Sequence, residues 1–337
     1  MTSYLIRRTL LAVPTLVVIA IVLFGILELT PGDPLADLPL TIPPEVRDDM
    51  RAALGLDQAW YVRFGLWLQQ LFIVEPLVAI DAALGTDFAD GRTRIVSYQS
   101  HAPVMGTIAE RLPQTLWVVG GAYVIGLAVA IPLGVFAANH RGSWIDHLIT
   151  LTTLTGYSMP SFFIGVLVIA VFAVNLGWLP SVYDTTHMVT DAGSLWVQIK
   201  QMILPVAVLS LFNAGLISRY VRAAMIDVLT QDFVRTAKAK GLPARRVLFG
   251  HALRNALLPV ITVAALGLPQ VFGGAIVTEQ VFQVNGLGHL LIIGIQGNDL
   301  PLVLTLAFLF AALVVVFNLI ADILYAVADP RVRYTDA

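Results

Sequence analysis

The 337-residue sequence contains no cysteine, and only 12% of its residues are charged. The missing cysteine excludes disulfides, thiolate metal sites, iron–sulfur clusters and a cysteine nucleophile. Soluble domains carry about 25% charged residues, roughly twice the share found here. Hydrophobic residues make up 58% of the chain instead. This composition indicates an integral membrane protein and leaves little room for a second, soluble domain.

Six apolar runs without Lys or Arg are long enough to cross the hydrocarbon core as helices, which takes about 20 residues. They are residues 9–29, 115–137, 148–176, 201–218, 256–278 and 302–321. The sequence therefore predicts an all-α membrane protein with six transmembrane helices. Pro160 lies inside the third run and predicts a kink or a break there. Glu75 and Pro76 interrupt the apolar stretch 66–80, so we expect that stretch to lie on the membrane surface or against other helices.

Positive charge is distributed unequally between the connecting segments. With the N-terminus placed inside, 13 of the 20 Lys and Arg residues also lie inside, and the net charges are +7 inside and −8 outside. The positive-inside rule therefore predicts cytoplasmic N- and C-termini. The first apolar run lacks a small-residue cleavage signal, so we expect it to be retained as a helix.

This orientation divides the chain into four parts. We expect an N-terminal transmembrane helix over 1–30 and an extracytoplasmic region over 31–111, with a short helix near 45–54. A core of transmembrane helices follows over 112–329 and includes a cytoplasmic loop at about 226–254. Residues 330–337 form a cytoplasmic tail.

The cytoplasmic loop has the pattern of a helical hairpin. Residues 226–240 place five apolar side chains on one face of a helix, beside a basic face: Val228, Leu229, Phe233, Val234 and Ala237. Gly241 readily adopts a left-handed cap, and Pro243 suits the first turn of a second helix over 243–254. From the residues alone, the hairpin either rests on anionic lipid or docks a cytoplasmic partner.

The loop sequence DFVRTAKAKGLPARRVLFGHALRNALLPVIT resembles the cytoplasmic Glu-Ala-Ala loop of permease subunits in binding-protein-dependent ABC importers. Arg235 and Thr236 stand where the general motif has Glu and Ala, as in the oligopeptide and dipeptide permeases. Five further segments resemble the B-type subunit of that subfamily: YLIRRTLLAVPTL with LTPGDP, ERLPQTL, SMPSFFIGVLVIAVFAVNLGWLP, MILPVAVLSL and LYAVADPRVRY. Two departures are a longer segment at 72–109 and Asn285, where the family pattern has Pro.

The resemblance implies a type I ABC importer permease in the cell inner membrane. Together with a second homologous permease, it would form the translocation path for di- or oligopeptides. It implies two cytoplasmic ATP-binding subunits that use ATP and Mg, and an extracytoplasmic substrate-binding protein. The chain itself has no phosphate-binding G-x-x-x-x-G-K-[ST] motif, so we expect a non-catalytic subunit without cofactor or metal. By resemblance, the coupling role falls on Asp232, Arg235, Thr236, Ala237, Ala239, Gly241, Leu242 and Arg245.

Polar residues near the spans are candidates for an outer gate or a path. Glu279, just after the fifth run, is the gate candidate, and Asn285 and Asn213 are further candidates. Intramembrane polar groups more often bond between helices, so we expect Glu28 and Asp322 to be paired or interfacial. Arg219 and Arg222 are expected to reach lipid phosphate at the end of the fourth run.

Other functions stay open at this point. Members of the same family that import nickel chelates or glutathione would have a similar sequence. A stand-alone channel or ion-coupled transporter is disfavoured because no charged residue lies at mid-membrane and the hairpin would be unexplained. An intramembrane hydrolase using Ser158 in GYSMP would need a base, and none of the six His residues lies within a predicted span.

Overall fold

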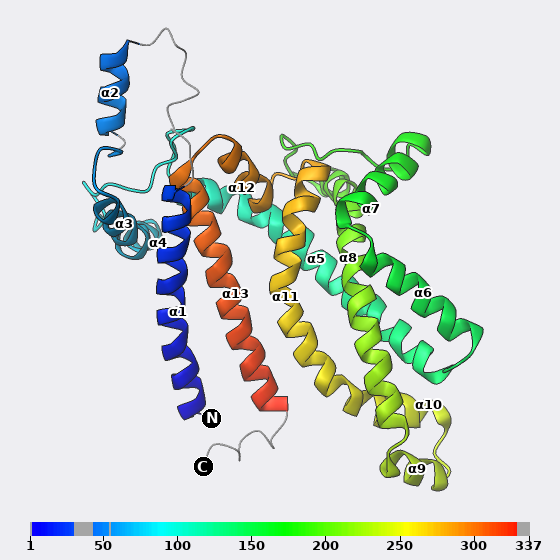
Figure 1. The fold of residues 1–337 in the computed structure, drawn as a ribbon. Helices are drawn as coiled ribbons and strands as arrows, with labels where there is room; N and C mark the ends of the chain where they lie inside the picture. Colours follow the sequence, from blue (N-terminus) through cyan, green and yellow to red (C-terminus); the bar gives the residue numbers. More distant parts are fainter. Residues whose placement is uncertain (1, 30–42, 54, 329–337) are drawn as a thin grey trace. The chain divides into compact units, whose positions relative to one another are not determined.

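The computed structural model describes residues 2–29, 43–53 and 55–328, which form helices joined by short segments (Figure 1). The chain divides into two compact units. The first unit comprises Met1–Leu10, Gln114–His289 and Leu313–Ala337, and the second comprises Leu11–Pro113 and Leu290–Ala312. The described residues contain no strand, only an isolated bridge between Val96 and Pro103, so the all-α prediction is confirmed.

The helices of the N-terminal part are α1 (Thr2–Leu29), α2 (Pro44–Ala53), α3 (Trp60–Gln69), the π-helical turn η1 (Gln70–Val74) and α4 (Glu75–Leu84). The middle of the chain forms α5 (Val104–Asn139), α6 (Trp144–Ser158), α7 (Ser161–Val168), η2 (Ile169–Asn175) and α8 (Ala192–Leu229). The remaining elements are α9 (Asp232–Ala239), α10 (Ala244–Arg246), η3 (Val247–Leu253), α11 (Arg254–Phe282), α12 (Leu287–Gln296) and α13 (Leu300–Ala328). The short helix expected near 45–54 corresponds to α2. The predicted tail 330–337 lies outside the described residues.

Six described helical runs are long and apolar enough to cross a membrane: Arg7–Leu29, Trp60–Leu84, Val104–Asn139, Ala192–Leu229, Ala244–Gly267 and Leu300–Ile323. Five of them coincide with, or overlap, predicted runs. The predicted run 148–176 is instead a bent pair, Trp144–Ser158 and Ser161–Asn175, with an angle of 104°. The break falls at Met159 and Pro160, which confirms the expectation from Pro160 because proline cannot donate to the preceding turn.

The expectation for residues 66–80 is wrong in its premise. Glu75 and Pro76 do not interrupt the helix, because α3, η1 and α4 form the continuous run Trp60–Leu84. Pro76 lies in the first turn of α4, directly after η1, where the wider π-helical turn tolerates the missing amide. Buried Glu75 is paired with Arg94, whose Nη2 lies 2.8 Å from the carboxylate.

Within the first unit, α8 packs against α5, α6 and α11, and glycines set how closely these helices approach. A Cβ atom added to Gly134 of α5 would lie 2.5 Å from Val221 Cβ and 2.7 Å from the Ser218 carbonyl oxygen. A Cβ at Gly215 of α8 would lie 2.6 Å from the carbonyl oxygen of Thr153 in α6. Helices in lipid associate through such small residues, since lipid tails provide no hydrophobic driving force between them.

Helix α8 begins at a capping box. The Asp191 carboxylate accepts a hydrogen bond from the Ser194 amide at 2.7 Å, and the Ser194 hydroxyl accepts one from the Asp191 amide. The hydrogen bonds from Ser194 hold the pKa of Asp191 below its ordinary value. This cap fixes the start of the helix at the loop that precedes it.

Two of the expected pairings are present and one expectation is corrected. Glu28 pairs with Arg63, and Asp322 lies 2.9 Å from Arg8. Arg222 does not need lipid phosphate, because its guanidinium forms a two-pronged ion pair with buried Asp146 at 2.7 and 2.8 Å. The sequence could not show this pairing, since 76 positions separate the partners. Arg219 is exposed, and its contact with lipid phosphate stays a prediction.

The glycine contacts generate a prediction for stability. Gly134→Ala should lower the unfolding temperature of the purified protein in detergent, with a loss of about 1–3 kcal/mol, because the methyl group would overlap α8. The matched control is Gly120→Ala in the same helix, where an added Cβ has no atom within 4 Å. This control should be neutral or stabilising by at most about 1 kcal/mol. Equal unfolding temperatures for the two variants would contradict the proposed role of Gly134.

Candidate functional site

The cytoplasmic hairpin predicted over 226–254 is present, but its first helix is not continuous. Helix α8 ends at Leu229, and Gln231 is extended, with φ −71° and ψ 150°, before α9 begins at Asp232. The expectation of one helix over 226–240 is therefore wrong. The predicted apolar face holds for four of its five residues, because Val228 and Leu229 at the end of α8 pack against the same small core as Val234 and Ala237 of α9. The fifth, Phe233, is 41% exposed and lies outside this core.

A tight turn ends α9. Gly241 has φ +75°, which glycine adopts without steric cost. The Gly241 amide donates to the Lys238 carbonyl at 3.0 Å, and the Leu242 amide donates to the Ala237 carbonyl at 3.3 Å. These two bonds define a Schellman motif. Leu242 then packs on the core of the hairpin, so the turn predicted from Gly241 and Pro243 is fixed by both hydrogen bonds and apolar contact.

Helix α9 has one face packed within the chain and one face open. Val234 and Ala237 are buried against Val247 of η3. The small side chain of Ala237, one of the expected coupling residues, thus allows α9 to approach its own chain. Six of the eight predicted coupling residues are exposed, and four of these lie on α9 itself: Asp232, Arg235, Thr236 and Ala239. They form an open face on α9, termed the α9 ridge.

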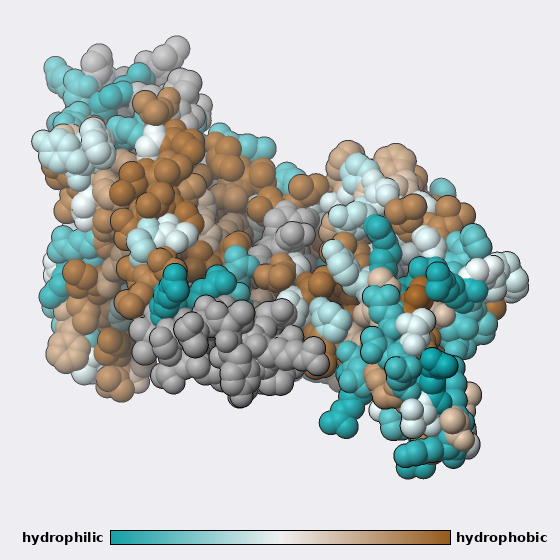
Figure 2. Space-filling view, turned by 60° about the horizontal axis from the view of Figure 1, so that its bottom comes forward, coloured by the Kyte–Doolittle hydropathy of each residue, from teal (hydrophilic) through white to brown (hydrophobic). Residues whose placement is uncertain are grey.

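The two charged residues of the α9 ridge pair with each other. Arg235 Nη1 lies 3.3 Å from Asp232 Oδ1, and both side chains are largely exposed. The Thr236 hydroxyl donates to the Asp232 carbonyl at 2.9 Å. An exposed ion pair of this kind contributes little stability, so both charges are available to a partner. Figure 2 shows hydrophilic atoms gathered over this end of the molecule.

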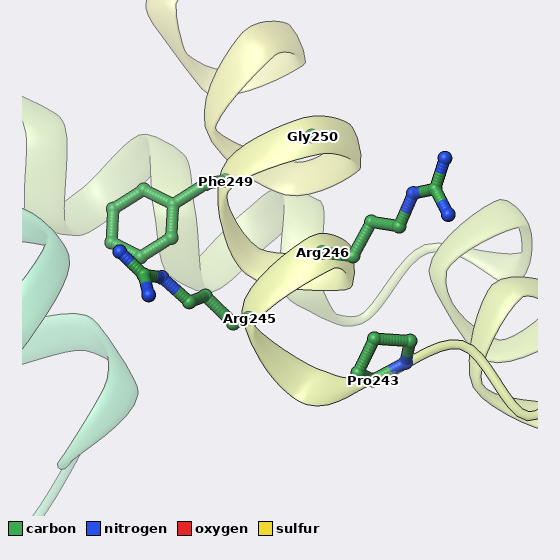
Figure 3. A pocket seen from close by; sticks show the side chains of 5 residues that line it. All are labelled: Pro243, Arg245, Arg246, Phe249 and Gly250. Carbon is green, nitrogen blue, oxygen red and sulfur yellow. The ribbon is translucent and has the colours of Figure 1, made fainter.

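Beside the ridge, an open depression of about 570 Å³ is lined by Pro243, Arg245, Arg246, Phe249 and Gly250. Figure 3 shows Arg245 extended toward the ring of Phe249, while Arg246 points away on the other side of the helix. Arg245, predicted as a coupling residue, therefore lies on a basic, concave surface. An exposed aromatic ring beside arginines is typical of the residues that anchor protein interfaces.

The gate candidate Glu279 lies at the end of α11 and is fully buried. Its carboxylate accepts hydrogen bonds from the Thr115 hydroxyl of α5 and the Gly288 amide, both at 2.7 Å, and from the His289 amide at 3.1 Å. These amides belong to the first turn of α12, where a negative charge is favourable. Glu279 therefore joins α5, α11 and α12 across a break that bends the chain by 81°.

The other path candidates do not join Glu279 in one site. Asn285 is half-buried in the turn between α11 and α12. Asn213 is buried on α8, and a Cβ at Gly126 of α5 would lie 2.9 Å from its Cβ. Its Nδ2 has no hydrogen-bond partner among the described residues. The described part of the chain holds no group of three or more His, Asp or Glu side chains that could bind a metal ion.

Two family models cover most of the chain. The binding-protein-dependent transport system inner membrane component matches residues 130–334, and the N-terminal model of such membrane components matches residues 1–119. The chain therefore belongs to the binding-protein-dependent transport system inner membrane component family. Together with its apolar helices, this membership makes it a multi-pass membrane protein and the permease component of a transport system.

Several full-length relatives are permeases of named substrates. The chain is 38% identical over 338 residues to the oligopeptide transport system permease protein AppB of Bacillus subtilis, covering 99% of this chain and 100% of that protein. It is 39% identical over 339 residues to a putative peptide transport system permease protein of Brucella abortus, with coverage of 99% and 100%. The glutathione transport system permease protein GsiC of Escherichia coli is 34% identical over 338 residues, with the same coverage.

A solved structure has a similar fold. A chain of the MetNI methionine ABC transporter in an inward-facing conformation aligns with a TM-score of 0.53 and 20% identity. The alignment covers 67% of this chain and 97% of that chain. The fold is therefore that of ABC transporter permeases, as the sequence resemblance implied.

The contacts of Glu279 generate a prediction. Glu279→Leu should destabilise the purified protein, because each buried amide left without an acceptor costs about 1–3 kcal/mol. Since the chain has no cysteine, a single Asn285→Cys can report on the bend, and maleimide should label it faster when Glu279→Leu is present. Glu110→Leu, at an exposed position of α5, is the matched control. Unchanged stability and labelling in Glu279→Leu would contradict this structural role.

Proposed function

We propose that this chain is the permease subunit of an ATP-driven importer that carries di- or oligopeptides delivered by a substrate-binding protein. The observation that carries the proposal is the full-length identity of 38–39% to permeases named for oligopeptide and peptide transport. Glutathione is the second candidate substrate, because GsiC is 34% identical over the same length and glutathione is itself a small peptide. No specific observation favours a nickel chelate.

The proposed complex has four further components. A second homologous permease completes the translocation path, and two cytoplasmic ATP-binding subunits hydrolyse ATP with Mg. An extracytoplasmic protein delivers the substrate. The sequence has no phosphate-binding motif, which supports the proposal that other subunits hydrolyse ATP.

The cytoplasmic hairpin is the proposed point of coupling to the ATP-binding subunits. The α9 ridge would enter a groove on such a subunit, with Asp232 and Arg235 orienting it, and the depression at Arg245 would extend the contact. Gly241 and Leu242 would transmit the motion, because the Schellman turn and its apolar contact hold α9 rigidly on η3. Glu279 would hold the bend near the path rather than act as a charged gate.

The proposed orientation has both termini and the hairpin in the cytoplasm, as the distribution of Lys and Arg indicates. Single cysteines can test it. An impermeant maleimide applied to intact cells should label Met188→Cys, which is 78% exposed in the segment before α8, and should not label Ala239→Cys on the α9 ridge. The reverse pattern would contradict the orientation. Permeabilised cells, in which both cysteines should react, are the control.

Purification of the tagged chain in a mild detergent tests the function. We expect a second multispanning permease and ATP-binding subunits to co-purify. In liposomes, the complex with its binding protein should import a radiolabelled peptide only with ATP. Import of glutathione without import of longer peptides would select the second candidate. Recovery of the chain alone, with transport in the absence of ATP, would instead support a channel or secondary transporter.

The turn at Gly241 tests the coupling within that complex. Gly241→Val should abolish ATP-driven import and uncouple the ATPase from peptide, because a β-branched residue resists φ +75°. The strain is in the backbone alone, since an added Cβ has no atom within 4 Å. Gly177→Val is the matched control, with φ +63° and equally open surroundings outside the hairpin. Coupled import by Gly241→Val at the control's level would show that the hairpin does not couple.

A further inference from the structure

The second unit contains a pocket of about 500 Å³ that the transport function does not explain. Its lining comes from α1, α2, α3, η1, the segment 93–98 and the start of α13. All of these residues belong to the same unit. The volume lies within the range of about 300–1,000 Å³ that is typical of small-molecule sites. None of its lining residues belongs to the hairpin or is a hydrogen-bond partner of Glu279.

The lining combines apolar rings with polar groups. Phe24, Trp67 and Leu304 contribute apolar surface, and Trp67 is held in place by an edge-to-face contact with Phe308 at 5.5 Å. The indole Nε1 of Trp67 donates to the Thr305 hydroxyl at 3.2 Å, so its polar atom is satisfied. Six polar side chains share the lining: Gln58, Arg63, Gln70, Thr93, Arg94 and Tyr98. A ligand that fits this lining has both an apolar and a polar part.

The two arginines provide hydrogen-bond donors, and each of their positive charges is balanced by a glutamate. Arg94 pairs with Glu75 through Nε at 3.3 Å and Nη2 at 2.8 Å, and Arg63 pairs with Glu28. A guanidinium has five N–H donors, so each pair leaves donors for a ligand. The Nε of Arg63 is buried and has no partner among the described residues. Because each arginine charge is already balanced by a carboxylate, the pocket disfavours a ligand with several negative charges. The remaining N–H donors of the planar guanidinium groups suit a phosphodiester, which has two phosphate oxygens to accept them.

The surrounding residues place the pocket at the level of lipid headgroups. Helix α1 ends at Leu29, just after the charge of Glu28. Helix α3 begins with Trp60 and Tyr61, which are 55% and 63% exposed, and such aromatic residues are enriched at the membrane surface. Four apolar side chains along α3 to α4 are also exposed: Leu66, Phe72, Ile73 and Ile80. An amphipathic ligand at this level is most simply supplied by the membrane itself.

We propose that this pocket binds the headgroup and glycerol region of a zwitterionic phospholipid. The phosphate oxygens accept hydrogen bonds from Arg63 and Arg94, and the amide oxygens of Gln58 and Gln70 accept hydrogen bonds from the ammonium group. The first part of the acyl chains lies against Phe24 and Trp67. The bound lipid thereby joins α1, α3 and α13 within the second unit. This inference does not depend on which substrate the importer carries.

The experiment uses the full chain, purified with its co-purifying subunits from nanodiscs of equal phosphatidylethanolamine, phosphatidylglycerol and phosphatidylcholine. Native mass spectrometry then measures the lipid retained per chain. Wild-type protein should retain about one phosphatidylethanolamine. Ala52→Phe adds a ring to the lining without removing an ion pair and should reduce retention about tenfold. Ala82→Phe, at an exposed position of α4 outside the lining, should retain the lipid.

A second variant, with its unfolding temperature, distinguishes loss of the lipid from loss of the fold. Arg63→Met removes donors and should lose the lipid, while its unfolding temperature in lipid-free detergent identifies any general loss of fold. No retained lipid in the wild type, or equal retention in Ala52→Phe, would overturn the proposal. Preferential retention of phosphatidylglycerol would overturn the argument from balanced charge. Displacement of the lipid by millimolar dipeptide would assign the pocket to the transported substrate instead.

Discussion

The close approach of α5 and α6 to α8 is the constraint on which the first unit depends. At Gly134 and Gly215, a single added methyl group would overlap a backbone carbonyl of the neighbouring helix. Such contacts fix the separation and the register of helices together, because a sliding movement would bring a larger side chain to the same place. The ion pair of Arg222 with Asp146 then joins α8 to the start of α6. Helix α8 is therefore a fixed reference against which α11 and the hairpin are placed.

Broken helices create a second constraint, because backbone amides inside a membrane need partners from the protein. The structure meets it twice with a buried carboxylate. In the first unit, Glu279 accepts hydrogen bonds from amides at the start of α12. In the second unit, buried Asp299 accepts hydrogen bonds from the amide of Leu302 at the start of α13, at 3.4 Å, and from the amide of Tyr98, at 3.1 Å. Glu279, the gate candidate from the sequence, and Asp299 thus each stabilise a helix terminus.

Local chemistry was predictable from the sequence, and distant pairing was not. Pro160 and Gly241 act on their own backbone, so the break and the turn could be placed correctly. The end of α8 at Leu229 was missed because the apolar pattern continues across Thr230 and Gln231, while the packing of Val234 on Val247 decides where the chain turns. The bend after α11 was missed for a related reason. It needs Gln283 at φ +56° and the contacts of Glu279 with α5 and α12, none of which leaves a local signal.

The same packing explains how a small cytoplasmic element could move long helices. Helix α9 is anchored on η3 by Val234 and Ala237, and η3 continues into α11 without a break. Farther along, Met225 of α8, Ala252 of η3 and Ala256 of α11 share one buried cluster. A force on the α9 ridge therefore reaches α8 and α11 together. Closely packed helices move as rigid bodies rather than deforming continuously, so such a force would displace α8 and α11 together. In the proposed coupling, Ala237, Gly241 and Leu242 would hold α9 rigid on its own chain, and the exposed charges of Asp232 and Arg235 would select the partner.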